Sequence, residues 1–63
     1  MELLKTVLAS GGEMKAEFYD DADSGQWLIK HVDLEGNEIA RSLTFPKNRI
    51  TKEDFIEGRF FSL

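Results

Sequence analysis

Few residues in this sequence have the chemistry that catalysis requires. General acid–base catalysis near neutral pH most often uses histidine, and the chain has one, His31. His31 alternates with Trp27 and Ile29 in an apolar run, so we interpret it as a partly buried structural residue. None of the serines stands in the Gly-x-Ser-x-Gly context of a nucleophile elbow. We therefore expect a non-enzymatic protein with no catalytic residues.

Cysteine and histidine, the usual ligands of transition metals, are equally scarce. The chain has no cysteine, which removes thiolate zinc sites and disulfides. A calcium loop that began at Asp21 would need oxygen ligands at its fifth and twelfth positions, which are Gly25 and Val32. We expect neither a metal site nor a cofactor.

Four acidic residues lie within seven positions and form the most distinctive charged group: Glu17, Asp20, Asp21 and Asp23. We interpret them as an acidic surface that binds a partner protein. Carboxylates at alternate positions of a strand lie about 6.5 Å apart, close to the phosphate spacing of a nucleic-acid strand. The alternative hypothesis is therefore an acidic nucleic-acid mimic that blocks a basic DNA- or RNA-binding groove. Lys15 stands between Glu13 and Glu17 on one strand face and breaks the row of carboxylates there. A solvated turn would also explain the aspartates.

A second candidate surface combines aromatic residues with one cation, as protein interfaces often do: Tyr19, Arg59, Phe60, Phe61 and Leu63. The same C-terminal residues could instead fold back and complete the core. Three further cations, Lys47, Arg49 and Lys52, give a weaker hypothesis of nucleic-acid binding. Three phosphate contacts and a net charge of −4 argue against direct binding to nucleic acid.

The composition is typical of a small folded protein, with 41% hydrophobic and 32% charged residues. We expect residues 1–63 to form a single domain, without a membrane-spanning segment and located in the cytoplasm. A domain of this size buries only about 60% of its unfolded surface. Without disulfides or a metal, association with a larger protein or with itself is the remaining source of stability. We therefore expect a small acidic interaction module, such as an inhibitor or accessory factor of the kind found in phages.

Alternating polar and apolar residues predict the elements that position these groups. Strands are expected at about 3–9, 14–19, 26–33 and 38–45, and Gly36 supplies the turn between the last two. Residues 1–10 also fit one face of a helix, but Thr6 and Val7 favour the strand.

The C-terminal part of the sequence predicts a helix. Thr51 is a typical N-cap, so a short helix is expected at about 52–57, packed on one face of the sheet. The expected core contains Phe18, Trp27 or Ile29, Phe45 and Phe55. The predicted fold class is α+β, mostly β: a three- to four-stranded antiparallel meander with a C-terminal helix.

Overall fold

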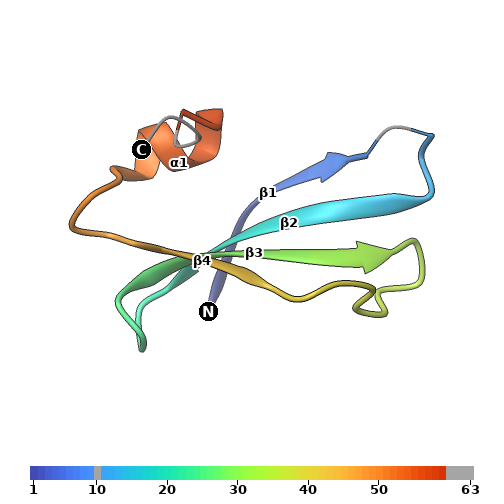
Figure 1. The fold of residues 1–63 in the computed structure, drawn as a ribbon, viewed down its shortest axis with the longest axis horizontal. Coiled ribbons are helices and arrows are strands. Elements are labelled where there is room, and N and C mark those ends of the chain that lie inside the picture. Colours follow the sequence, from blue (N-terminus) through green and yellow to red (C-terminus); the bar gives the residue numbers. More distant parts are fainter. Residues whose placement is uncertain (10, 60–63) are drawn as a thin grey trace.

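A computed structural model of the protein describes residues 1–9 and 11–59. Over these residues the chain forms strands β1 (Glu2–Leu8), β2 (Met14–Asp21), β3 (Gln26–Asp33) and β4 (Leu43–Pro46), followed by helix α1 (Lys52–Glu57). Neighbouring strands pair antiparallel in the order β1-β2-β3-β4, and α1 lies over one side of the sheet (Figure 1). The predicted α+β meander is confirmed, and its first element is a strand rather than a helix.

The fourth strand is shorter than the predicted range of 38–45. Glu38 makes an isolated bridge with Val32, whereas regular pairing resumes only at Leu43, opposite Ile29. Four residues, 39–42, therefore lie opposite two residues of β3, which shifts the register by two. A shift of two residues leaves each side chain on its original face. The alternation of polar and apolar residues therefore continues through residues 39–42, and the sequence pattern did not reveal the register shift.

Phe55 of α1 is the centre of the core and has no exposed surface. Its ring stacks on Trp27, with centroids 5.4 Å apart and planes 16° apart. The rings of Phe18 and Phe45 lie tilted against it at 5.1 and 6.1 Å. These contacts and the burial of Ile29 confirm the predicted core. The prediction omitted Ile50, which is buried and accepts a 2.7 Å hydrogen bond from the Trp27 indole through its carbonyl oxygen.

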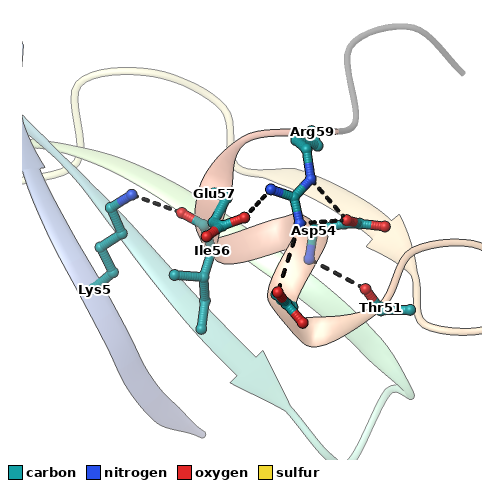
Figure 2. A network of polar contacts seen from close by, with 7 residues as sticks. Lys5, Thr51, Asp54, Ile56, Glu57 and Arg59 are labelled. Atoms are coloured by element: carbon teal, nitrogen blue, oxygen red, sulfur yellow. Dashed lines mark hydrogen bonds and ion pairs between the residues drawn. The ribbon is translucent and has the colours of Figure 1, made fainter.

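Helix α1 is defined at both ends by its own residues. Thr51 Oγ1 accepts a hydrogen bond from the Asp54 amide at 3.1 Å, as expected of an N-cap (Figure 2). Gly58 ends the helix with a φ of +77°, in the left-handed region that favours glycine. Lys5 then joins the helix to β1, because its Nζ donates to the Ile56 carbonyl oxygen at 2.6 Å (Figure 2).

Candidate protein-binding site

The register of the sheet separates the side chains that meet α1 from those that point the opposite way. Phe18, Trp27 and Phe45 contact Phe55. Because side chains alternate along a strand, the residues next to them lie on the other face. We call this surface the helix-free face and define it by six residues: Leu3, Glu17, Tyr19, Leu28, Lys30 and Thr44. Four of these pair directly across the sheet, in the order Leu3, Tyr19, Leu28, Thr44.

Tyr19 is fixed near the centre of this face by two charged neighbours. Its hydroxyl donates to Glu17 Oε1 at 2.9 Å, and the Lys30 ammonium lies 5.5 Å from the ring centroid. Lys30 also pairs with Glu38 at 3.6 Å. Burial raises the pKa of the Tyr19 hydroxyl, and the hydrogen bond and negative charge of Glu17 raise it further. Tyr19 therefore presents a neutral, oriented aromatic ring between two leucines.

The four predicted acidic residues do not form one surface. Glu17 lies on the helix-free face, whereas Asp20 lies on the opposite face, across from Trp27, and its carboxylate pairs with the Lys47 ammonium. Asp21 accepts a 2.8 Å hydrogen bond from the Ser24 hydroxyl, which closes the turn after β2. Asp23 is exposed in the same turn. The row of carboxylates that a nucleic-acid mimic requires is thus divided between two faces and a turn.

The three predicted cations are also separated in their roles. Lys47 is held between Asp20 and the ring of Trp27, whose centroid lies 4.8 Å from the ammonium. This placement makes Lys47 part of the packing around the core. Arg49 and Lys52 are exposed and form no ion pair with any residue that the structure describes.

Only part of the predicted aromatic surface can be located. The Arg59 guanidinium is bound to the acidic side chains of α1: Asp54 at 3.0 Å, Glu53 at 3.8 Å, and Glu57 (Figure 2). Arg59 therefore follows the helix, on the side of the sheet opposite to Tyr19, and these two residues do not share a surface. Phe60, Phe61 and Leu63 lie outside the described residues.

Strand β1 carries exposed apolar side chains that the sequence analysis did not select. Leu3, Val7 and Leu8 have exposed fractions of 49%, 39% and 64%. Adjacent apolar residues at Leu3-Leu4 and Val7-Leu8 place hydrophobic groups on both faces of one strand. Because a helix covers only one face of the sheet, one residue of each apolar pair must lie on the uncovered face. The two apolar pairs were therefore the feature of the sequence that could have indicated an exposed apolar surface on this strand.

Within the described part of the chain, no group of three histidine, aspartate or glutamate side chains is arranged to hold a metal ion. None of the helical residues described forms a segment long and apolar enough to cross a membrane. Comparison of the chain with protein-family models, curated proteins and solved structures found no match.

Proposed function

We propose that this protein is a small, non-enzymatic interaction module that docks on a larger protein through its helix-free face. The observation that carries the proposal is the row of Leu3, Tyr19 and Leu28, which pair across three strands on the face opposite to α1. Tyrosine is enriched at protein interfaces because its large apolar ring ends in a polar group.

The arrangement of Tyr19 supports binding for a second reason. A side chain that is mobile before binding loses conformational entropy when a partner immobilises it. Glu17 and Lys30 already restrict Tyr19 in the free protein, so less entropy is lost on docking. Glu17, Lys30 and Glu38 also provide a polar margin beside the apolar row, the composition expected around the buried centre of an interface.

The biological role that we propose is that of a cytoplasmic inhibitor or accessory factor. A cysteine-free, acidic composition supports a cytoplasmic location. The separation of Glu17, Asp20 and Asp23 favours docking through the apolar row over mimicry of a nucleic acid, because a mimic requires its carboxylates on one surface.

The proposal is tested by comparing two matched variants in a capture experiment from a lysate of the source cells. Leu3→Glu places a charge in the apolar row, whereas Leu34→Glu makes the same change at a similarly exposed position in the turn after β3. We expect the wild type and Leu34→Glu to retain one common partner that Leu3→Glu loses. Equal retention by both variants would contradict docking through the helix-free face.

A further inference from the structure

We infer that the free edge of β1 binds the same edge of a second copy of the chain, with the two strands antiparallel about a two-fold axis at Val7. The two sheets would then continue into each other without a break. This interaction uses the edge of the sheet rather than its helix-free face, so it goes beyond the proposed docking on a larger protein and does not depend on it.

Within residues 1–9 and 11–59, the backbone of β1 presents groups along this edge that no other strand pairs with. The Ala9 amide donates to the Met14 carbonyl oxygen at 2.9 Å, so this position forms a hydrogen-bonded pair of the antiparallel ladder. Such pairs alternate with non-hydrogen-bonded ones. The pair Val7–Ala16 is therefore hydrogen-bonded, and Thr6 and Leu8 direct their N–H and C=O groups away from β2. Because β1 is the first strand in the sheet order, these groups point to the outside.

The two edges of the sheet differ in how well they are protected. Edge strands are normally kept from pairing by short length, proline, bulges or charged side chains. Strand β4 has four residues and ends at Pro46. Strand β1 has a bulge near Leu3–Lys5, and the ammonium of Lys5 is turned towards α1. After the bulge, Thr6–Leu8 is exposed, uncharged and regular, so this segment is open to pairing.

The register follows from the outward groups and the charges. With the two-fold axis at Val7, Thr6 of each copy lies opposite Leu8 of the other, and both residues exchange hydrogen bonds through groups that β2 leaves free. Val7 then faces Val7 of the second copy in a non-hydrogen-bonded pair, where side chains come closest. Lys5 lies opposite Ala9. An axis at Lys5 would instead place two ammonium groups opposite each other and cross the bulge.

Cysteine substitution tests this register directly, because the chain has no cysteine of its own. At a two-fold axis only the residue on the axis faces its own copy. The Cα atoms of a non-hydrogen-bonded pair lie about 4.5 Å apart, within the range that a disulfide spans. We expect Val7→Cys to form a disulfide-linked dimer on mild oxidation. Thr6→Cys, which faces Leu8, and the exposed control Leu34→Cys should form no disulfide-linked dimer under the same conditions.

A second measurement needs no cross-link. Thr6→Pro removes an outward N–H and places the proline ring on the free edge, while the ladder to β2 does not use that group. Val7→Lys places two like charges at the axis. We expect the wild type to sediment as a monomer–dimer mixture and each variant to raise the dimer Kd at least about tenfold, with circular dichroism unchanged.

Three outcomes would overturn the inference. One is a wild type that shows no dimer at a protein concentration of about 1 mM, because its dimer Kd would then be far weaker than about 1 mM. Another is a dimer that both variants leave intact, because it would use a different surface. The third is a wild type that forms no dimer with itself while its β1 edge pairs with a strand of another protein. The capture experiment with Leu3→Glu and Leu34→Glu is a separate measurement. The proposed docking on a larger protein can therefore fail or succeed independently of the proposed dimer.

Discussion

The Tyr19 hydroxyl donates a hydrogen bond to the Glu17 carboxylate across 2.9 Å, between two side chains on the same face of β2. These residues are two positions apart, and side chains with that spacing lie on one side of a strand. Phe18, which stands between them, points the other way and packs on Phe55. One strand thus supplies both the core under α1 and the centre of the candidate binding face.

The Tyr19 environment predicts a loss of stability at alkaline pH. Its pKa is raised in the folded state, mainly by burial, so folding favours the neutral phenol. This contribution is fully present below about pH 10, the pKa of an unfolded tyrosine, and is lost as the pH rises through the folded-state pKa. Urea unfolding between pH 8 and about pH 11 should show a decline in the free energy of unfolding that is smaller in Tyr19→Phe. Identical declines in both proteins would contradict the prediction.

The loop after β3 predicts an effect of the opposite sign at acid pH. Asp33 accepts hydrogen bonds from the amides of Glu35 and Asn37, both at 2.9 Å, and the bond from Asn37 is the main cause of its lowered pKa. Its contribution to stability is present above about pH 4 and is lost as the pH falls through the folded-state value. Asp33→Asn should be less stable than the wild type at pH 7. The two proteins should converge when unfolding is followed at progressively lower pH.

Removal of the central aromatic ring should nearly abolish folding. Phe→Ala at a buried site costs about 3–5 kcal/mol. A 63-residue domain has a total stability of only about 3–9 kcal/mol on the usual scale per residue. We expect Phe55→Ala to lose the circular dichroism and buried-tryptophan fluorescence of the folded state at 25 °C, whereas Leu34→Ala, at an exposed turn position, should retain both. A cooperative thermal transition in Phe55→Ala close to that of the wild type would show that the core lies elsewhere.

The contact between Lys5 and Ile56 predicts a smaller and more local effect. Lys5→Met keeps the apolar part of the side chain but removes the charged donor to the Ile56 carbonyl oxygen and the ammonium 5.5 Å from the Phe18 ring centroid. The expected cost is about 1.5–3 kcal/mol. Hydrogen exchange of the Gly58 amide, which closes the helix end, should become faster. The matched control is Lys15→Met, because Lys15 makes no ion pair with any other described residue. Equal effects of both substitutions would contradict a specific role of Lys5.

Local chemistry was sufficient to predict most of the fold. Thr51 and Gly58 mark the helix ends, and alternation placed Trp27 and Ile29 on the core side. Ile50 could not be assigned to the core because it belongs to no periodic element, and its burial depends on the position of α1. The two-residue register shift before Leu43 leaves alternation unchanged and is therefore invisible in the sequence.

The candidate site was less predictable than the fold. Strand β2 continues to Asp21 rather than ending near Tyr19, and this extension puts Asp20 on the face opposite to Glu17. Asp20 and Glu17 are close in the sequence but therefore lie on different surfaces of the protein. Tyr19 was selected as a binding residue, but its neighbours Leu3 and Leu28 follow from strand pairing and from the side on which α1 packs. Both are tertiary features that a single sequence does not specify.

Photo-cross-linking from defined positions tests the proposed docking most directly. A photoreactive leucine analogue placed at Leu3 or Leu28 keeps the size and apolar character of the helix-free face. The same analogue at Leu34 stands in the turn after β3, outside the six residues that define this face. After irradiation in a lysate of the source cells, we predict one common cross-linked partner from Leu3 and Leu28 and none from Leu34. A partner that cross-links equally well from all three positions, or only from Leu34, would contradict docking through the helix-free face.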